Sequence, residues 1–426
     1  MKKTLMALAV LLLVGVGVGA KVLLWPADDI GPPATPNSLS QAQLVARGAY
    51  LARAGDCMAC HTTRGGVPYA GGRALATPFG NVISPNITPD KDTGIGTWSA
   101  DDFWRAMHNG KSKDGRLLYP AFPYTNYTKV RREDSDALYA YFQSVPPQRQ
   151  ANLPHTLRFP YNQQIALAAW RALYFKPAVH QDEPARSVEW NRGAYLVQGL
   201  GHCSACHSSR TTLGGSEEGL SGGLIPMLGW YAPSLTSNAE AGLGDWDTEH
   251  IVALLHTGVS PRATVFGPMA EVVRQSLQHL EVTDVRAMAV YLKSLPDTQP
   301  PVKAAPRDTS EAATKQLAQG AKLYETHCAS CHQADGKGVP PGYPPLAGNR
   351  ALLTASPVNA IRIVLNGGFA PGTAGNPRPY GMPPYGPVLN DGEVAAVVSH
   401  LRASWGNNAP AVTALEVNKY RSVPLE

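Results

Sequence analysis

Helical patterns of apolar and polar residues recur along the chain in three pairs. The first helix of each pair is predicted around residues 47–51, 192–196 and 319–323, where Arg-Gly-Ala-Tyr-Leu occurs twice and Gln-Gly-Ala-Lys-Leu once. The second, closing helix is predicted over residues 134–142, 284–295 and 391–403. Recurrence of one pattern in one order indicates an internal repeat. We therefore expect a mainly α-helical chain built from three copies of one unit.

One further helix, predicted over residues 165–175, has almost no polar face. Such a helix is either buried between two domains or exposes an apolar surface to a membrane or a partner subunit. The pattern alone leaves both interpretations open.

The N-terminus predicts export from the cytoplasm. Lys2 and Lys3 precede an apolar run over residues 4–20. The run ends in a sequence that resembles a signal-peptidase site. Alternatively, only Lys21 interrupts an apolar stretch that continues to Trp25 and is long enough to span a bilayer. We favour the uncleaved anchor.

These patterns divide the chain into an anchor and three domains. Residues 1–36 are predicted to be a signal or membrane anchor with a linker, and residues 37–183 and 184–300 to be the first two domains. Residues 301–426 hold the third domain. A segment rich in Pro, Ala and charge, residues 295–314, is predicted to connect the last two domains.

Composition adds two constraints. With 426 residues, the chain is long enough for about three domains. It holds 41 Gly and 37 Pro, which predicts a loop-rich fold that needs staples. The net charge of +5 comes without a basic run, so nothing favours a nucleic-acid partner.

All six cysteines lie in one motif, Cys-x-x-Cys-His, which occurs three times. The motifs are Cys57, Cys60 and His61; Cys203, Cys206 and His207; and Cys328, Cys331 and His332. This is the attachment motif of haem c, in which both thiols bond the porphyrin and the histidine binds iron. A zinc site would need a second pair of ligands at fixed spacing. The sequence therefore predicts three covalent haems.

Two methionines are predicted to be the sixth ligands of the second and third haem irons. Met269 follows a proline, and Met382 lies between a glycine and prolines, so both occupy rigid loop positions ahead of a closing helix. A thioether ligand raises the haem potential, as a fast electron carrier needs.

The first repeat departs from this pattern. The proposed methionines follow His256 by 13 residues and Asn366 by 16, whereas Phe122, which cannot bind iron, stands 14 residues after His108. The first iron is therefore either five-coordinate or takes a sixth ligand from elsewhere, with Met107 and His108 as the candidates. Met107 aligns with Leu255 and Leu365 in the other two repeats, which favours a role in the apolar core. Because His256 occurs in a repeat that has its methionine, His108 is expected to bond a propionate or the backbone.

No catalytic constellation is visible in the sequence. There is no Ser-His-Asp set, no phosphate loop and no dinucleotide fingerprint. Electron transfer is therefore the chemistry we expect. The alternative is a haem enzyme of the peroxidase type that uses an open first iron.

Several segments resemble the three-haem cytochrome c subunits of bacterial membrane-bound dehydrogenases. They include "GDCMACHT", "SPNITPDKDTGIG", "DGRLLYPAFPYTNYTKV" and "GPMAEVVRQSLQHL". The resemblance covers nearly all of the chain after residue 40 and implies three tandem mono-haem cytochrome c domains. Alcohol and gluconate members usually have methionine where Phe122 stands, which favours the molybdenum branch.

The resemblance also implies partners and a location. Members of this family accompany quinoprotein alcohol dehydrogenases, flavoprotein gluconate, fructose or sorbitol dehydrogenases, or molybdenum aldehyde or N-heterocycle dehydrogenases. We therefore expect a dehydrogenase catalytic subunit as electron donor. Ubiquinone, a soluble cytochrome or a terminal oxidase would be the acceptor. The place would be the periplasmic face of the inner membrane.

Overall fold

The fold is described from a computed structural model. It describes residues 38–216, 219–225, 227–238, 242–297 and 308–423, together with Met6 and Gly15. Apart from Met6 and Gly15, the predicted N-terminal anchor lies outside the described residues, as does the centre of the predicted linker 295–314. Within the described part, no helix is long and apolar enough to cross a bilayer.

The described chain falls into two compact units. Unit 1 holds the described residues up to Glu183 together with Val197–Ala205 and Arg210–Ser216. Unit 2 holds Pro184–Leu196, Cys206–Ser209 and the described residues from position 219 on. Two segments of the second repeat, at and just after its cysteine motif, thus belong to unit 1. The three-domain boundaries drawn from the sequence stay a prediction.

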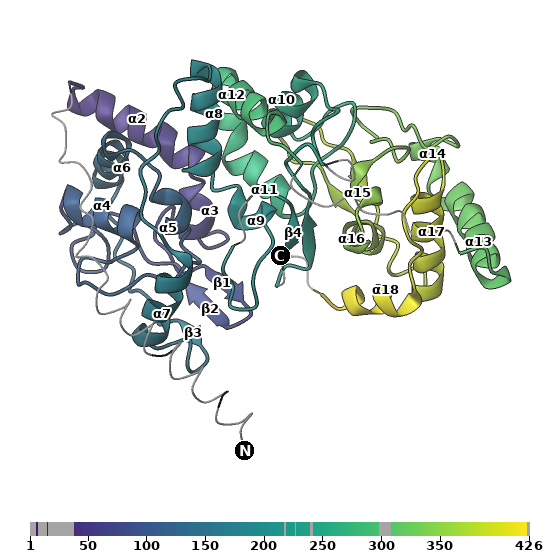
Figure 1. The fold of residues 1–426 in the computed structure, drawn as a ribbon, viewed down its shortest axis with the longest axis horizontal. Coiled ribbons are helices and arrows are strands. Elements are labelled where there is room, and N and C mark those ends of the chain that lie inside the picture. Colours follow the sequence, from purple (N-terminus) through teal and green to yellow (C-terminus); the bar gives the residue numbers. More distant parts are fainter. Residues whose placement is uncertain are drawn as a thin grey trace. The chain divides into compact units, whose positions relative to one another are not determined.

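The first repeat consists of short helices and one small sheet (Figure 1). Its helices are α2 (Gln41–Ala54), α3 (Cys57–His61), α4 (Ala100–Asn109), α5 (Tyr124–Tyr127), α6 (Arg132–Ser144) and α7 (Gln164–Tyr174). Its antiparallel strands, in the order β1-β2-β3, are β1 (Ala74–Thr77), β2 (Gly80–Ile83) and β3 (Thr156–Leu157). In the register of this sheet, Ala74 pairs with Ile83 and Gly80 with Leu157.

The second and third repeats follow a similar order of elements. The second contains α8 (Val188–Gln198), α9 (Ser204–His207), β4 (Gly223–Ile225), β5 (Trp230–Ala232), α10 (Thr248–Thr257), α11 (Pro268–Gln275), the 3₁₀ turn η1 (Leu277–His279) and α12 (Val282–Lys293). The third contains α13 (Glu311–His327), α14 (Ala329–His332), α15 (Arg350–Leu353), α16 (Val358–Asn366), β6 (Gly368–Phe369), β7 (Gly381–Met382), α17 (Asp391–Ala403) and α18 (Ala414–Arg421). The two strand pairs, β4-β5 and β6-β7, are antiparallel.

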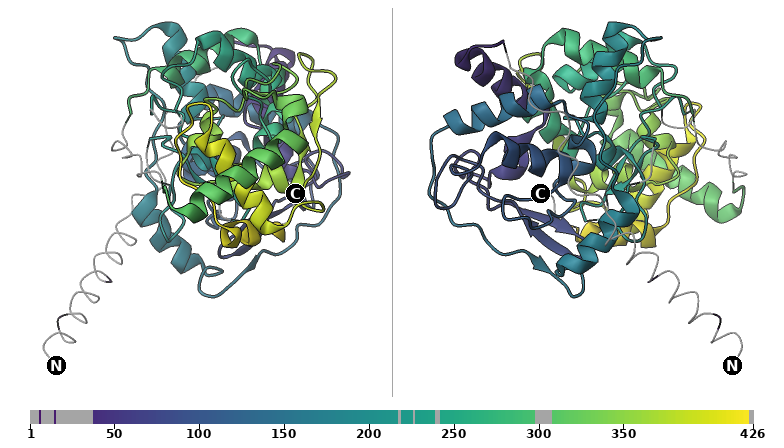
Figure 2. Two further views of the ribbon diagram at one scale, coloured as in Figure 1. Left: turned by 90° about the vertical axis from the view of Figure 1, so that its right-hand side faces the viewer. Right: turned by 60° about the vertical axis from the view of Figure 1, so that its left-hand side comes forward.

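Each repeat packs its first helix against its closing helix through a glycine. A Cβ atom on this glycine would lie about 2 Å from a carbonyl oxygen of the closing helix, so only hydrogen fits at the contact. The pairs are Gly48 with Ala137 at 1.9 Å, Gly193 with Ala287 at 1.9 Å, and Gly320 with Ala396 at 2.1 Å. The third pair, α13 and α17, can be followed as adjacent green and yellow helices in Figures 1 and 2.

An ion pair reinforces the crossing in the first two repeats. The Arg47 Nε donates to Asp134 at 2.6 Å, and the Arg192 guanidinium bonds both Asp284 oxygens at 2.8 and 2.6 Å. In the third repeat, Gln319 stands in the place of the arginine. The recurring Arg-Gly of the sequence is thus a helix-packing motif, with one residue for charge and one for close approach.

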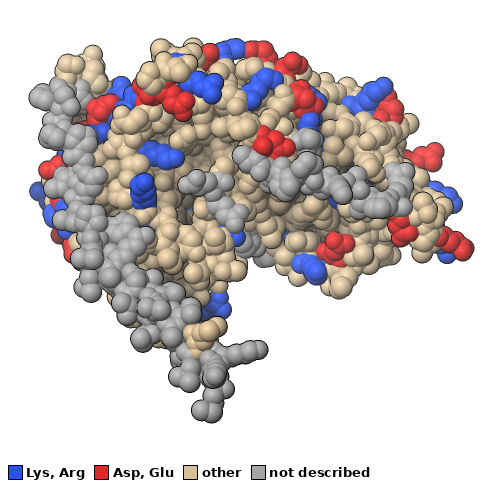
Figure 3. Space-filling model, viewed as in Figure 1, with Lys and Arg blue, Asp and Glu red and all other residues tan. Residues whose placement is uncertain are grey.

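One apolar core lies in the third repeat. It is formed by the inward faces of α16 and α17, closed by Tyr324 of α13 and Val417 of α18. An Asn390–Glu393 capping box fixes the start of α17. On the face drawn in Figure 3, acidic and basic side chains are interspersed among the described residues, without a large area of one sign.

Candidate functional site

The three cysteine motifs lie on short helices that follow the first helix of each repeat. These are α3, α9 and α14, with Cys203 and Cys328 immediately before the last two, and none of the six cysteines is in a disulfide. Burial raises the pKa of Cys57 to about 12 and that of Cys328 to about 11. Because none of the six cysteines is in a disulfide, every sulfur is available for a thioether bond to haem.

The histidine of every motif is held by a proline carbonyl. The Nδ1 atoms of these histidines lie 2.8 Å from the oxygen of Pro85 for His61, 2.7 Å from that of Pro233 for His207, and 3.0 Å from that of Pro344 for His332. Burial lowers the pKa of all three imidazoles. A neutral ring that donates its Nδ1–H to a carbonyl presents its Nε2 lone pair to a metal.

These prolines were missed in the sequence reasoning, although the sequence carries a trace of two of them. The segments Ser84–Thr88, "SPNIT", and Ala232–Thr236, "APSLT", are copies of one motif with the proline at the second place. The third carbonyl acceptor, Pro344, comes from a different context, "YPPLAG".

Met382 is placed close to the third motif by the core of its repeat. In the strand pair β6-β7, Met382 pairs with Gly368. The Met382 side chain packs against the apolar core of the third repeat, and so does Cys328. The Tyr385 hydroxyl, three residues later, donates to the His327 carbonyl at 2.6 Å. The methionine loop is thereby hydrogen-bonded to the residue just before the first cysteine.

Met269 is presented by a constrained turn. It is the second residue of α11, after Gly267 and Pro268. The glycine has φ 57°, and a Cβ there would lie 2.7 Å from the Trp230 ring. Both the left-handed backbone and this contact favour glycine, so the turn before the methionine is rigidly defined.

Phe122 occupies the corresponding place in the first repeat. Its ring centroid lies 5.3 Å from that of Tyr127. Burial and the neighbouring Cys57 and Cys60 thiols raise the pKa of Tyr127 well above its usual value, so this ring lies beside the first motif. The Tyr127 hydroxyl donates to the Gly55 carbonyl at 3.2 Å, much as Tyr385 bonds His327 in the third repeat.

The two candidate ligands for the first iron are both buried in α4. Met107 is part of the apolar core. His108 stacks on Trp104 with ring centroids 4.5 Å apart, and its Nδ1 lies 2.9 Å from the Thr128 carbonyl oxygen. A backbone partner for His108 is one of the two roles that the sequence favoured over ligation.

The site offers buried donors that suit a haem. In unit 2, Trp246 Nε1 and Asn366 Nδ2 are buried without a hydrogen-bond partner among the described residues. Such orphaned donors are costly unless an acceptor is supplied. A haem propionate is an acceptor of the right kind, so the thiols, imidazoles and buried donors together fit haem c.

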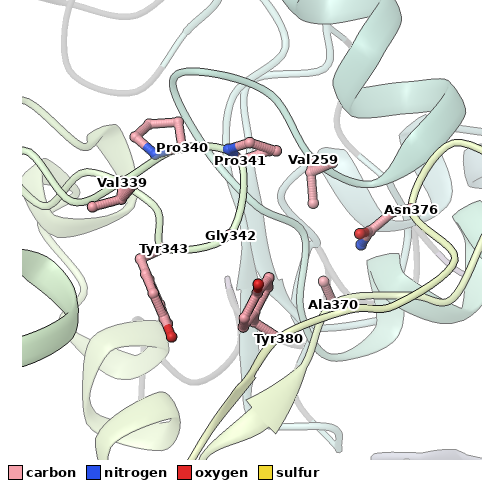
Figure 4. A pocket seen from close by; sticks show the side chains of 9 residues that line it. All are labelled: Val259, Val339, Pro340, Pro341, Gly342, Tyr343, Ala370, Asn376 and Tyr380. Atoms are coloured by element: carbon pink, nitrogen blue, oxygen red, sulfur yellow. The ribbon is translucent and has the colours of Figure 1, made fainter.

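A pocket adjoins the third motif. It has a volume of about 240 Å³ and is lined by Val259, Val339, Pro340, Pro341, Gly342, Tyr343, Ala370, Asn376 and Tyr380 (Figure 4). The neighbouring Cys331 thiol raises the pKa of Tyr343, which places this wall of the pocket beside the motif. Tyr343 and Tyr380 have ring centroids 5.2 Å apart.

Within unit 1, residues of the first repeat contact residues at the start of the second motif. The Leu200 side chain would touch a Cβ on Gly55 at 3.4 Å, and the Tyr127 and His202 rings are 5.6 Å apart. Asn126 Nδ2 donates to the Ser204 hydroxyl at 2.8 Å. Residues 200–204, at and just before the start of the second motif, are thus packed against α5 and next to Gly55 of the first repeat.

Comparisons with known proteins agree with this chemistry. The sequence profile of the family described as cytochrome c matches residues 45–146 and 317–405. The chain is 43% identical to the gluconate 2-dehydrogenase cytochrome c subunit of Pantoea cypripedii, over 89% of each chain. It is 40% identical to the cytochrome c subunit of the quinone alcohol dehydrogenase of Gluconobacter oxydans, over 89% of this chain and 82% of that subunit.

A third relative is larger. The chain is 41% identical to a nicotinate dehydrogenase subunit of Pseudomonas putida, over 93% of this chain and 33% of that protein. The peroxidase alternative finds no support among these relatives. The cysteine motifs, the histidine geometry and the similarity over most of the chain lead to one conclusion. The chain belongs to the family of cytochrome c subunits of dehydrogenases, carries covalent haem c and transfers electrons.

Proposed function

We propose that this chain relays electrons through three covalent haems, from the catalytic subunit of a periplasmic dehydrogenase to an acceptor of the respiratory chain. The observation that carries the proposal is the bond from a proline carbonyl to the histidine of each Cys-x-x-Cys-His motif. Because it occurs in all three motifs, all three histidines are prepared to bind iron in the same way.

The protein groups in this proposal have separate tasks. Cys57, Cys60, Cys203, Cys206, Cys328 and Cys331 attach the haems, and His61, His207 and His332 are the proximal ligands. Met269 and Met382 are the sixth ligands of the second and third haems. When bound, haem c accepts and releases one electron at a potential that a thioether ligand raises.

The contacts between motifs support transfer along the chain. In unit 1, Leu200 and His202, which precede the second motif, lie next to Gly55 and Tyr127 of the first repeat. In unit 2, the second and third repeats are joined by a pair of hydrogen bonds between Asn359 and the Tyr231 backbone, at 2.9 and 2.8 Å. We propose that the second haem exchanges electrons with each of the other two.

The partner and the location rest on the relatives. Their names describe subunits of gluconate, alcohol and nicotinate dehydrogenases, with identities between 40% and 43%. The proposed donor is therefore a dehydrogenase catalytic subunit of the flavin, quinone or molybdenum type. We place the chain on the periplasmic face of the inner membrane, held by the N-terminal segment, with ubiquinone, a soluble cytochrome or a terminal oxidase as acceptor.

The test is reduction of the full chain by a supplied dehydrogenase. The purified protein is mixed anaerobically with substrate and the catalytic subunit of a gluconate, alcohol or nicotinate dehydrogenase in turn, and haem reduction is followed by absorbance. One donor should reduce the haems within its own turnover time, and substrate alone should not. Turnover by the chain without any donor, or reduction by none of the three, would count against the relay.

A further inference from the structure

Helix α7 exposes aliphatic side chains and buries an arginine, which is the reverse of an ordinary surface helix. Its buried positions are Leu167, Arg171 and Ala172, whereas Ile165 is 71% exposed and Leu173 53% exposed. The two exposed residues are eight positions apart and therefore lie on one face. A helix on a water-facing surface would bury the aliphatic side chains and expose the cation.

The buried cation has a defined place. Arg171 is 5% exposed, and its guanidinium lies 5.1 Å from the Tyr124 ring centroid and 4.6 Å from that of Phe175. Two aromatic faces stabilise the buried charge. The orientation of α7 is therefore fixed by its inner contacts, and the apolar face is held outward.

The outward face continues beyond the helix. Phe159 is 79% exposed just before α7. The Tyr161 ring packs at a tilt against the Phe79 ring, with ring centroids 4.3 Å apart. On the other side, the Trp170 indole donates to the carbonyl of Leu213, whose own side chain is exposed. We define the α7 patch as Phe159, Tyr161, Ile165, Leu173 and Leu213, all of which belong to unit 1. Figure 1 shows α7 next to β3 in this unit.

Within the segment that forms most of the α7 patch, the exposed charged side chains are basic. Residues 137–181 contain Arg149, Arg158, Arg171 and Lys176 and no Asp or Glu. Arg158 and Lys176 are exposed at the two ends of the segment that forms the patch. Exposed aliphatic and aromatic side chains with basic residues beside them are the composition of a surface that lies on an anionic bilayer.

The length of chain outside the described residues favours the same occupant. If the apolar segment that ends at Trp25 is retained as an anchor, residues 26–40 connect it to α2. A connection of this length spans at most about 50 Å when fully extended. This connection would keep unit 1 close to the bilayer. A basic and apolar surface on unit 1 would then contact lipid more readily than a partner that must diffuse to it. A second copy of the chain would instead bring two basic rims together.

We infer that the α7 patch docks unit 1 onto the anionic surface of the lipid bilayer, with Phe159, Ile165 and Leu173 in contact with the acyl region. The inference goes beyond the electron relay. It assigns α7 the second of the two interpretations that its sequence pattern left open.

The test measures what covers the patch in the full chain. Ile165→Cys and Leu173→Cys are labelled with a nitroxide, since the native cysteines are all in attachment motifs. Each is reconstituted in vesicles of phosphatidylethanolamine and phosphatidylglycerol. The accessibility of the label to lipid-soluble oxygen and to a water-soluble nickel chelate is then compared. Leu415→Cys on α18, where leucine is 69% exposed in unit 2, is the matched control.

Docking predicts high oxygen and low nickel accessibility at positions 165 and 173, and the reverse at position 415. The contrast should weaken in vesicles of phosphatidylcholine alone, which lack the anionic headgroup. Free access of the nickel chelate to position 165 would overturn the inference. Shielding from both reagents would also overturn it, because a protein surface would then be the occupant. Haem reduction by a dehydrogenase, measured on the same labelled samples, separates this outcome from a failure of the relay.

Discussion

Phe122 in the first repeat stands at the loop position that Met269 takes in the second. In the first repeat, the Leu118 N–H donates to the Gly110 carbonyl at 2.8 Å, and Phe122 follows four residues later. In the second repeat, the Val265 N–H donates to the Gly258 carbonyl at 2.9 Å, and Met269 follows four residues later. Equivalent backbone hydrogen bonds thus precede both loops. The side chain four residues later is Phe122 in the first repeat and Met269 in the second.

This substitution leads to a spectroscopic prediction. The red absorption band that reports methionine bound to ferric haem should correspond to two haems of the chain and not three. Met269→Ala and Met382→Ala should each remove roughly half of it, because each deletes one thioether ligand. Phe122→Met should add to the band and raise the potential of the first haem in a redox titration.

The contrary result is equally specific. If Phe122→Met changes neither the spectrum nor the potentials, another residue already holds the sixth position of the first iron. Met107→Leu and His108→Asn would then be the next variants to examine, and the one that alters the first haem would identify the ligand.

Haem content can be changed one motif at a time. The exported wild-type chain should carry three haems in a pyridine haemochrome assay, because each motif supplies two thiols and one histidine. Replacing both Cys203 and Cys206 with alanine should lower the count to two without affecting the other motifs. A wild-type count of two or fewer would refute the assignment of three attachment sites.

The glycine at the helix crossing should be intolerant of a methyl group. Gly193→Ala places a Cβ 1.9 Å from the Ala287 carbonyl oxygen, so α8 and α12 must separate. Overpacking of this kind costs about 1–3 kcal/mol of unfolding free energy. Denaturant unfolding followed by circular dichroism should show a lower midpoint. Gly372→Ala is the control, since nothing lies within 4 Å of its Cβ, and equal midpoints for the two variants would contradict the crossing.

An ion pair between the second and third repeats should make unit 2 sensitive to acid. Asp245 lies 2.5 Å from Arg350 and 3.2 Å from Arg262. Burial tends to raise the pKa of this carboxyl, but the hydrogen bonds and charges of the two guanidinium groups outweigh burial and lower it. A lowered folded-state pKa means that the carboxylate stabilises the fold above its unfolded pKa of about 4. That contribution is lost as pH falls through the folded value.

Asp245→Asn should therefore lower the unfolding midpoint at neutral pH and have no effect in strong acid. Because Asp245 is half-exposed, the difference should be about 1 kcal/mol or less. A double-mutant cycle with Arg350→Met isolates the pair. A difference that persists unchanged in strong acid would show that the carboxylate charge is not its cause.

The sequence by itself determined the chemistry of the site and the helix pairs around it. Haem attachment needs two thiols and an imidazole within five residues, so the motif is local and visible. The closing helix predicted over residues 391–403 has the bounds of α17, because a continuous apolar stripe and its capping residues are also local. The resemblance of the sequence to cytochrome c subunits of dehydrogenases was confirmed by relatives that match most of the chain.

Only the tertiary structure decided which distant groups meet. The carbonyls that hold His61, His207 and His332 lie 24, 26 and 12 residues away, and although the first two prolines share a sequence motif, nothing in that motif shows that its carbonyl meets a histidine. The partner of His108 is a backbone carbonyl 20 residues away, which the residue type does not reveal. For α7, the sequence shows many apolar residues. The buried face of α7 is set by the packing of Arg171 on the rings of Tyr124 and Phe175. These contacts are made only in the folded chain.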